Sequence, residues 1–207
     1  MSNKLLGNLP QGLLFVVSAP AGTGKTTLAH MLCDEFEAIV ISVSCTTRVP
    51  RPHEVPGVDY HFISPKEFEE KLSSKAFLEH VSIFDHAYGT LHETVEKEQS
   101  LGRHVLLVID TQGHKKICAL KAPHISIFIH PPSLSELRHR LEKRGTENAP
   151  AIDKRLSFAH TETKNAHLYD YEVVNDHLQT AYQILRSIII AEEHKRLKTQ
   201  KESLCQN

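Results

Sequence analysis

The chain has 207 residues, 40% of them hydrophobic, which suits one α/β core with a smaller insert better than two independent domains. Its 24 Lys and Arg residues against 25 Asp and Glu residues give a net charge of −1. This balance excludes a protein-wide field that would attract nucleic acid or an acidic membrane, so we expect basic clusters to bind local ligands.

The cysteines and histidines show no metal or disulfide pattern in the sequence. Cys33, Cys45, Cys118 and Cys205 have no C-x-x-C spacing, and the 15 histidines form neither H-E-x-x-H nor a Cys/His cluster. The chain shows no signal peptide and no apolar run of roughly 18 residues. We therefore expect a cytoplasmic protein without a histidine-built metal site, a membrane or nucleic-acid partner, or an obligate protein partner.

The first predicted strand, residues 13–17, leads into a phosphate-binding loop. The loop fits the pattern A/G-x4-G-K-S/T and consists of Ala19, Pro20, Ala21, Gly22, Thr23, Gly24, Lys25, Thr26 and Thr27. Its glycines let backbone N–H groups surround the phosphates of ATP, and the following helix presents its positive end. Lys25 would reach the β- and γ-phosphates, and the Thr26 hydroxyl would face Mg²⁺. Ala19 replaces the usual first glycine, which requires a negative φ there.

The helix after this loop extends to about residue 37, and an apolar run over 38–43 completes a βαβ unit. Residues 44–52 have no strand or helix period and contain two prolines, so we expect an exposed, basic loop. Short strands are predicted over 57–63, 77–84 and around 88–90, with a capped helix from Ser64 to about Ser73. Residues 44–90 therefore form a small α+β insert.

The second half of the core begins with a helix over 91–101 and a buried strand over 105–109 that ends in Asp110, as Walker B strands do. Next come a strand over 125–129 and a helix over 134–143 capped by Ser133. They are followed by a helical lid over about 138–165, which overlaps this helix, and by a strand over 171–174. A long helix over 178–197 ends the core, and we expect its last charged residues, Glu192, Glu193, Lys195, Arg196 and Lys198, to form a solvated face. Residues 1–43 and 91–207 are thus predicted to form a phosphate-loop core with a parallel five-stranded sheet flanked by helices.

Two arginine clusters suggest a second phosphate-bearing substrate. The first comprises Arg48 and Arg51 on a proline-stiffened loop, with Tyr60 and Tyr88 nearby in the insert, and suits a terminal phosphate. The second lies in the lid and would place positive charge over the transferring phosphoryl group; it comprises Arg140, Arg144 and Arg155.

From residue 12 to about 192 the chain resembles a guanylate kinase. The matching stretches are Ser44-x-Thr46-Thr47-Arg48-x-Pro50-Arg51, Gly57-x-Asp59-Tyr60-x-Phe62, Phe77-Leu78-Glu79, Tyr88-Gly89-Thr90, Ile109-Asp110-x-Gln112-Gly113, Arg140-Leu141-x-x-Arg144-Gly145-Thr146 and Val174-Asn175-Asp176. The resemblance implies transfer of the γ-phosphoryl group of MgATP to GMP or dGMP.

The resemblance also implies site roles. The phosphate of GMP is held by Arg48, Arg51, Tyr60 and Tyr88, and the guanine faces Ser44, Glu79 and Thr90. Phosphoryl transfer involves Lys25, Arg140, Arg144 and Arg155, and Asn175 lies near the adenine of ATP. Asp110 contacts GMP and, with Thr26, holds Mg²⁺ directly or through water.

Chemistry supports the role of Glu79 independently. Guanine presents N1–H and N2–H₂ as adjacent donors, which one carboxylate accepts together, whereas adenine has no such pair on that edge. No nucleophile or general base is needed, because in-line transfer to a phosphate oxygen depends on positioning and charge neutralisation.

The sequence departs from the family at Ala19, at Ala87 and at Val108, which replaces the first acid of Asp-x-Asp-x-Gln-Gly. Either Thr26 and Asp110 alone support the metal, which we favour, or an acid from the insert replaces the missing one. Two rival functions remain: a non-catalytic phosphopeptide-binding module of this family, and a kinase of another phosphorylated acceptor.

Overall fold

The structure, a computed structural model, describes residues 4–83, 85–145 and 148–202. A wholly parallel five-stranded sheet runs through its centre and confirms the predicted core. The strand order is β2 (Ile39–Ile41), β7 (His104–Val108), β1 (Leu14–Ser18), β8 (Ile125–His130) and β9 (Tyr171–Val174). Because helices cover both faces, β1 is buried along its whole length, which explains its continuous apolar sequence.

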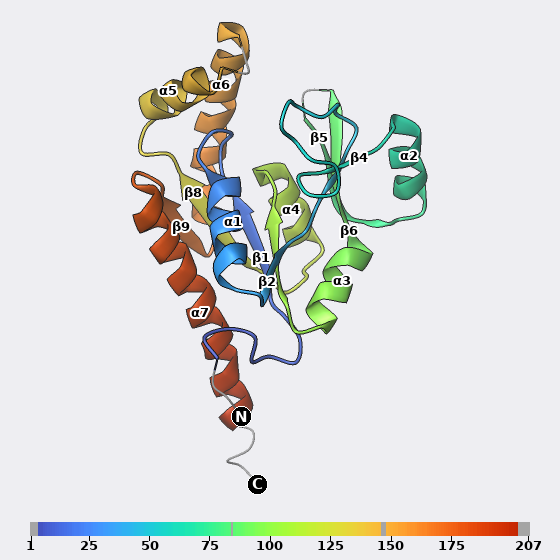
Figure 1. The fold of residues 1–207 in the computed structure, drawn as a ribbon, viewed down its shortest axis with the longest axis vertical. Coiled ribbons are helices and arrows are strands. Elements are labelled where there is room, and N and C mark those ends of the chain that lie inside the picture. The colour runs from blue at the N-terminus through green and yellow to red at the C-terminus, as the bar shows by residue number, and fades with distance from the viewer. Residues whose placement is uncertain (1–3, 84, 146–147, 203–207) are drawn as a thin grey trace.

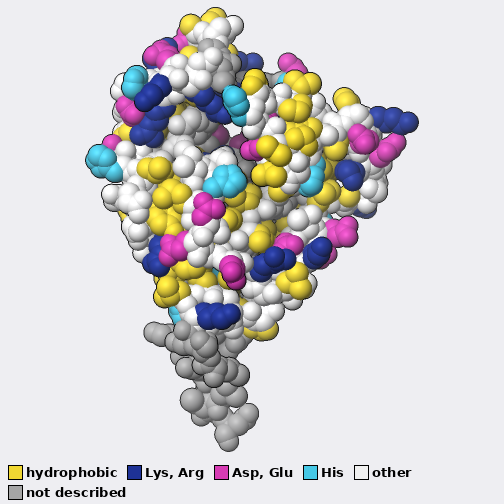
Figure 2. Space-filling model, viewed as in Figure 1, with side chains coloured by type: hydrophobic (Ala, Val, Ile, Leu, Met, Phe, Trp, Pro, Cys, Tyr) yellow, Lys and Arg dark blue, Asp and Glu magenta, His cyan; other side chains and the backbone are white. Residues whose placement is uncertain are grey.

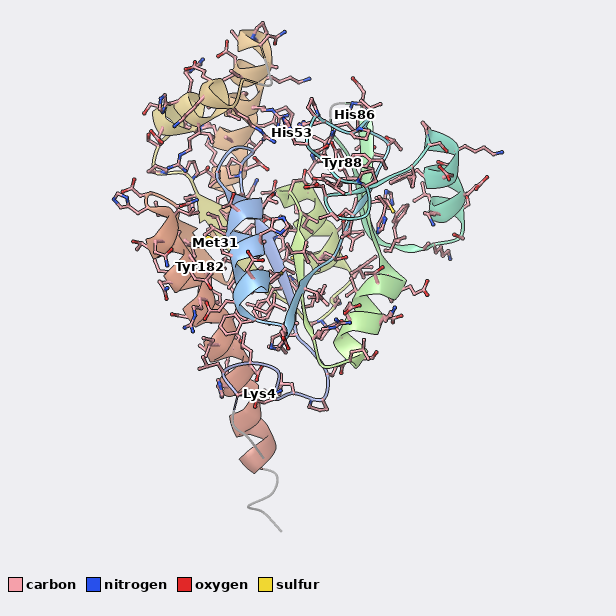
Figure 3. The ribbon with its side chains drawn as sticks, in the orientation of Figure 1. Lys4, Met31, His53, His86, Tyr88 and Tyr182 are labelled. Carbon is pink, nitrogen blue, oxygen red and sulfur yellow. The ribbon has the colours of Figure 1, made fainter. Side chains whose placement is uncertain are left out.

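Helices form a layer on each face of the sheet (Figure 1). On one face α1 (Lys25–Glu35) and α7 (Leu178–Glu202) pack through Leu28, Leu32, Leu185 and Ile189 against alternate residues of β1. On the other face α3 (His92–Ser100) and α4 (Thr111–Ala119) contribute Val95 and Ile117 to a second core. At the contact between α1 and α7, Tyr182 and Arg186 both donate to Glu35, and Tyr182 lies beside Met31 in Figure 3.

The insert has its own mixed sheet, ordered β4 (His61–Phe62), β3 (Cys45–Thr46), β6 (His86–Leu91) and β5 (Phe77–Ile83). The predicted helix is present as α2 (Pro65–Ser73), and Ser64 forms the expected capping box with Glu67. Phe84, predicted in the second strand, lies outside the described residues. In Figure 1 the insert stands to one side of the core.

Two expectations for the insert are wrong in part. Cys45 and Thr46 are buried in β3 rather than part of an exposed loop, because Thr46 donates its hydroxyl to the carbonyl of Ala87 on β6, 3.0 Å away. The strand expected over 57–63 is limited to His61–Phe62, since Gly57 has a φ of 80° and a turn precedes Tyr60. A pairing of two residues is too short to produce a period in the sequence.

Helix α4 was not predicted between Asp110 and the next strand. Gly113 in its first turn disfavours a helix, but Asp110 caps it, with the Gly113 N–H donating to Asp110 Oδ1 at 2.8 Å. The cap therefore outweighs the intrinsic preference of the glycine.

The lid is a hairpin of α5 (Leu134–Arg144) and α6 (Ala149–Lys164), which lies above the carboxyl ends of the strands in Figure 1. It has a small core of Leu137, Leu141, Ile152 and Ala159. Ser133 caps α5 as expected, accepting from the Glu136 N–H at 3.0 Å. Thr146, part of the matching stretch, lies outside the described residues. A short 3₁₀ helix, η1 (Ala166–Leu168), connects the lid to β9.

The solvated face expected near the end of α7 is wrong for two acids. Glu192 is 8% exposed and accepts a hydrogen bond from the Tyr171 hydroxyl, and Glu193 is fully buried because the segment before β1 folds over it. Glu193 accepts from the N–H groups of Gly7 at 2.8 Å and Asn8 at 3.0 Å. Lys195 is exposed as expected, while the side chains of Arg196 and Lys198 lie outside the described ones.

Within the described part of the chain, no helix has both the length and the apolar character needed to cross a membrane.

Candidate active site

The phosphate-binding loop connects β1 to α1 at the carboxyl edge of the parallel sheet. Gly22 and Gly24 have φ angles of 89° and 95°, a backbone conformation that glycine adopts without strain. Ala19 is buried and does not have a positive φ, so the condition for its replacing glycine is met. A Cβ on Gly22 would lie 2.9 Å from Leu141, and one on Gly24 would lie 2.7 Å from Asn175 Nδ2. The lid and β9 therefore pack directly against the loop.

Lys25 begins α1 and turns back over this loop. Its Nζ lies 3.2 Å from the carbonyl oxygen of Ile109 and 3.5 Å from that of Ala19. Burial lowers the pKa of Lys25, while the nearby Glu162 and Asp110 oppose the shift. Within the described residues the ammonium group thus donates to backbone carbonyls at the strand ends, with the carboxylates of Glu162 and Asp110 nearby, an arrangement suited to a phosphate that displaces the carbonyls.

Asn175 and Arg140 brace the loop from the side. Asn175 is 3% exposed, and its Nδ2 donates to the carbonyl of Thr23 at 2.7 Å. Arg140 donates Nη1 to the carbonyl of Asn175 at 3.1 Å and Nε to Glu136 at 2.9 Å. In the described contacts, Asn175 stabilises the conformation of the phosphate-binding loop. Its expected position near the adenine of ATP stays a prediction.

Glu79 lies on β5 of the insert and is 3% exposed. Its Oε1 accepts from the Thr90 hydroxyl at 2.7 Å, while Oε2 has no hydrogen-bond partner among the described residues. Burial raises the pKa of Glu79, the Thr90 hydrogen bond opposes this, and Asp110 adds to it. Gly113 of α4 allows the close approach, since a Cβ there would lie 3.0 Å from Glu79 Oε2. Two expected guanine contacts, Glu79 and Thr90, therefore lie together beside α4, and Ser44, the third, precedes β3.

Arg48 and Arg51 meet an acid that the sequence reasoning missed. Glu54 Oε1 lies 2.8 Å from Arg48 Nη2 and 3.8 Å from Arg51 Nη1. The guanidinium of Arg48 also stacks over the ring of Tyr60, 5.5 Å from its centroid, and Tyr60 packs against Tyr88 at 5.9 Å. Glu54 follows Arg51 by three residues, a spacing that could have suggested the pair.

The two arginine clusters converge across the space between insert and lid. Burial lowers the pKa of Arg51, and the neighbouring charges of Arg48, Arg144 and Arg155 add to this effect. Figure 2 shows the surface hollowed between the lid and the insert, and in Figure 3 Tyr88 lies within the insert with His53 at the edge nearest the lid. Mutually repelling guanidinium groups of this kind indicate a site for an anion.

Asp110 and Thr26, the expected metal ligands, lie at the end of β7 and the start of α1, and Val108 is half-buried. A carboxylate from the lid, Glu162, reaches the same region, although neither the motif nor its place on α6 indicated this. Burial raises the pKa of Glu162 to about 7, while the charge of Lys25 opposes the shift and that of Asp110 adds to it. Asp110 thus has two acids in its neighbourhood, Glu162 from the lid and Glu79 from the insert.

A separate pocket of about 550 Å³ lies between the start of α5, α6 and the ends of β8 and β9. It includes the hydrogen bond between His130 Nε2 and Glu172 Oε2, 2.7 Å long. None of the predicted site residues lines it, so we assign it no role in the site.

Comparison with known proteins agrees with the resemblance inferred from the motifs. Residues 11–192 match the family model described as guanylate kinase. The guanylate kinase of Protochlamydia amoebophila (strain UWE25) is 53% identical over 192 residues, covering 91% of this chain and 95% of that protein. That of Chlamydia pneumoniae is 48% identical over 185 residues, covering 89% of this chain and 90% of that protein.

The fold also matches a solved structure. The crystal structure of guanylate kinase from Anaplasma phagocytophilum superimposes with a TM-score of 0.73 and 35% sequence identity, covering 88% of this chain and 86% of that one.

Proposed function

Because the chain belongs to the guanylate kinase family and so transfers the γ-phosphoryl group of ATP to GMP, we propose how its residues carry out that reaction. The observation that carries the proposal is Glu79, a buried carboxylate beside α4 with one oxygen that has no partner among the described residues. A carboxylate left in this state costs free energy unless a ligand completes its hydrogen bonds. The adjacent N1–H and N2–H₂ donors of guanine provide what it lacks.

The phosphate of GMP binds to Arg48 and Arg51, supported by Tyr60 and Tyr88. Glu54 holds the two guanidinium groups in the absence of this phosphate, as the 2.8 Å contact with Arg48 supports. A dianionic phosphate competes well with one carboxylate, because it offers three acceptor oxygens to forked donors. The sugar has no assigned contact, so we expect dGMP to be accepted as well.

ATP binds through the phosphate loop, whose backbone N–H groups surround its phosphates. Lys25 exchanges its two carbonyl contacts for the β- and γ-phosphate oxygens. Thr26 and Asp110 offer a hydroxyl and a carboxylate, the hard oxygen ligands that Mg²⁺ prefers, so the residues present fit this ion. Bound there, Mg²⁺ neutralises charge on the phosphates, and Glu162 adds a third oxygen ligand group nearby.

Transfer itself requires alignment and charge neutralisation. Arg144 and Arg155 face the insert from the lid, as their effect on the pKa of Arg51 supports, and Arg140 fixes the base of the lid to Asn175. Closing the lid over both nucleotides excludes water, strengthens each electrostatic contact and places positive charge on the transferring group. No general base is invoked, since the attacking oxygen already belongs to a phosphate.

The rival functions are less well supported. A phosphopeptide-binding module has no need of Lys25 and Thr26 in a formed phosphate loop, and a phosphosugar does not complete the hydrogen bonds of Glu79. Cys33, Cys45 and Cys118 are free thiols among the described residues, which supports a reducing compartment such as the cytoplasm.

The test is a coupled assay of ADP release with GMP, dGMP, AMP and UMP as acceptors. We expect turnover with GMP, somewhat slower turnover with dGMP, and almost none with AMP or UMP. Equal use of AMP would reject the guanine site, and GMP binding without turnover would favour the non-catalytic module.

A further inference from the structure

A cluster of side chains outside the nucleotide site has the composition of a metal centre. It comprises His114 and Cys118 on α4 and His124 in the loop before β8, and their ligand atoms all lie within 4.8 Å of one another. His114 and Cys118 are four residues apart and so share one face of the helix. The sequence pattern His-x3-Cys-x5-His is not one of the usual zinc spacings, which is why sequence reasoning expected no such site.

The distances fit tetrahedral coordination. Cys118 Sγ lies 3.2 Å from His114 Nε2 and 3.7 Å from His124 Nε2. With Zn–S near 2.3 Å and Zn–N near 2.05 Å, tetrahedral angles place sulfur and nitrogen ligands about 3.6 Å apart. The two sulfur–nitrogen separations are therefore already close to those that an ion would impose, and the ligand atoms of the two histidines lie within 4.8 Å of each other.

Neighbouring contacts orient both imidazoles for binding through Nε2. The carbonyl of Ala122 can only accept, so His124 Nδ1 carries the proton and donates to it at 2.8 Å, leaving a lone pair on Nε2. His114 is 2% exposed and stacks on Tyr169 with ring centroids 3.9 Å apart, which fixes its plane. Cys118 lies at the surface, which gives an ion an entry path.

We propose that His114, Cys118 and His124 bind a borderline-soft divalent metal ion of the zinc class, at a site separate from the Mg²⁺–nucleotide site. On binding, the Cys118 S–H bond breaks and its proton passes to solvent, while two neutral imidazoles donate lone pairs and water takes the fourth position. One thiolate and two imidazoles favour Zn²⁺, and its spectroscopic substitute Co²⁺, over Mg²⁺, which takes oxygen ligands.

The consequence is a link between two segments. The ion joins α4 to the loop before β8, and at the helical rise His114 and Cys118 lie about 6 and 12 Å along the axis from Asp110, the N-cap of α4. Metal binding should thus stabilise the fold by mass action without contacting the nucleotides.

The test uses the full chain freed of metal by chelation and kept in excess Mg²⁺, so that the oxygen-ligand site is already occupied. We expect one equivalent of Co²⁺ to give intense visible d–d bands and a near-ultraviolet thiolate-to-cobalt band, both displaced by Zn²⁺. Cys118→Ser should abolish the thiolate band, and His124→Gln should weaken Zn²⁺ binding roughly 100-fold in competition with a chromophoric chelator.

Matched controls are Cys33→Ser and Cys205→Ser, which remove thiols elsewhere in the chain and should leave the cobalt spectrum unchanged. Zn²⁺ should raise the Tm of the wild type and of both controls but not that of Cys118→Ser. In the absence of metal the Tm of Cys118→Ser should equal that of the wild type, and its turnover of GMP should be unchanged. Absence of the thiolate band in the wild type, or its persistence in Cys118→Ser, would overturn the proposal and leave a hydrogen-bonded cluster only.

Discussion

Buried charges lie near both ends of the parallel strands, but their partners differ. At the amino end, Glu193 accepts from Gly7 N, from Asn8 N and Nδ2, and from His104 Nε2 at 2.5 to 3.0 Å. At the carboxyl end, Glu79 has one oxygen without a described partner, and the described hydrogen bonds of Lys25 go to two backbone carbonyls. A buried charge with complete partners contributes to folding, whereas an incomplete one at the edge where parallel sheets bind ligands indicates a site.

The amino-end network even defines a tautomer. The Leu13 N–H donates to His104 Nδ1 at 2.9 Å, so the proton of the neutral ring is on Nε2 and is donated to Glu193. No atom of this pair is left for a ligand. The comparison therefore predicts opposite effects for mutations at the two ends, and the following experiments test it in order of expected size.

The largest effect is expected for base selection at the carboxyl end. We expect the wild type to prefer GMP over AMP by about 10⁴-fold in kcat/KM, because adenine would leave the buried carboxylate unpaired. Glu79→Gln should reduce this preference to about 10²-fold or less without lowering Tm, since the amide presents a donor toward the donors of guanine. Steady-state kinetics with both acceptors measures the ratio, and Glu69→Gln on the exposed face of α2 is the control. An unchanged ratio in Glu79→Gln means that guanine is recognised elsewhere.

Removing the paired acid at the amino end should affect folding instead. Glu193→Ala leaves the buried groups of Asn8 and His104 without their acceptor, and we expect a loss of about 3 to 5 kcal/mol in the free energy of unfolding. Urea unfolding measures this loss, with Lys195→Ala as the exposed neighbour control. At a temperature where the variant is folded, its kcat should remain near the wild-type value. A loss below about 1 kcal/mol would contradict our view that this network stabilises the fold.

Lys25→Ala should show the reverse pattern. The lysine is a point charge for the β- and γ-phosphates, so we expect kcat/KM to fall by roughly 10²-fold or more, with the Tm unchanged or raised because a desolvated charge is removed. Turnover and thermal melting are measured on the same preparation. Near-normal turnover would rule out the ATP-site assignment.

The amino-end pair should also make stability depend on pH. Burial lowers the pKa of His104, and the Glu193 carboxylate opposes this shift without cancelling it. Burial alone would raise the pKa of Glu193, but hydrogen bonds from Asn8, Gly7 and His104 outweigh it, so the pKa of Glu193 is lowered. Both folded-state pKa values lie below the unfolded ones, so the unfolded state binds more protons and stability falls as pH drops below about 6.5. Urea unfolding between about pH 7.5 and pH 5 should show this fall, and it should be as large or larger in Glu193→Gln, because the carboxylate that opposes the lowering of the His104 pKa is removed. A smaller fall in the variant would exclude His104 as its source.

The smallest effect concerns Val108, where a hydrophobic residue replaces an acid two positions before Asp110. Asp110→Asn should cut activity and raise the free Mg²⁺ needed for half-maximal rate, whereas Val108→Asp should change turnover by less than about threefold, because Glu162 already brings another acid to this region. Rates measured against free Mg²⁺ for both variants decide the matter. If Asp110→Asn left both the turnover and the free Mg²⁺ requirement unchanged, this strand end would not bind the metal.

Local patterns predicted the parts of the molecule that local sequence determines. The phosphate loop, the buried strand β1 and the capping box at Ser64 are contiguous and depend on neighbours within a few residues. Glu79 could be assigned because guanine chemistry and the resemblance to a family agreed on one residue. The order of the five strands was not predicted, since apolar runs define strands and not their neighbours, and only the structure gives it.

The remaining features depend on contacts between distant segments. Glu162 reaches Lys25 only because the lid folds over the loop, and Glu193 is buried only because the segment around Asn8 covers it. His124 joins His114 and Cys118 through a loop between α4 and β8 that has no periodic signal. In each case the charge or ligand type was visible in the sequence, but its partner was separated from it by the tertiary fold.

Gly113 has a consequence for how this enzyme can evolve. A methyl group there would meet Glu79 Oε2 and Ile109 Cδ1, each at 3.0 Å, so one position touches both the base-reading carboxylate and the core. A single substitution at position 113 that altered the contact with Glu79, and with it the choice of nucleobase, would also disturb the packing of Ile109. Base choice and foldability are thereby inherited together, and a change of substrate must begin at a different codon.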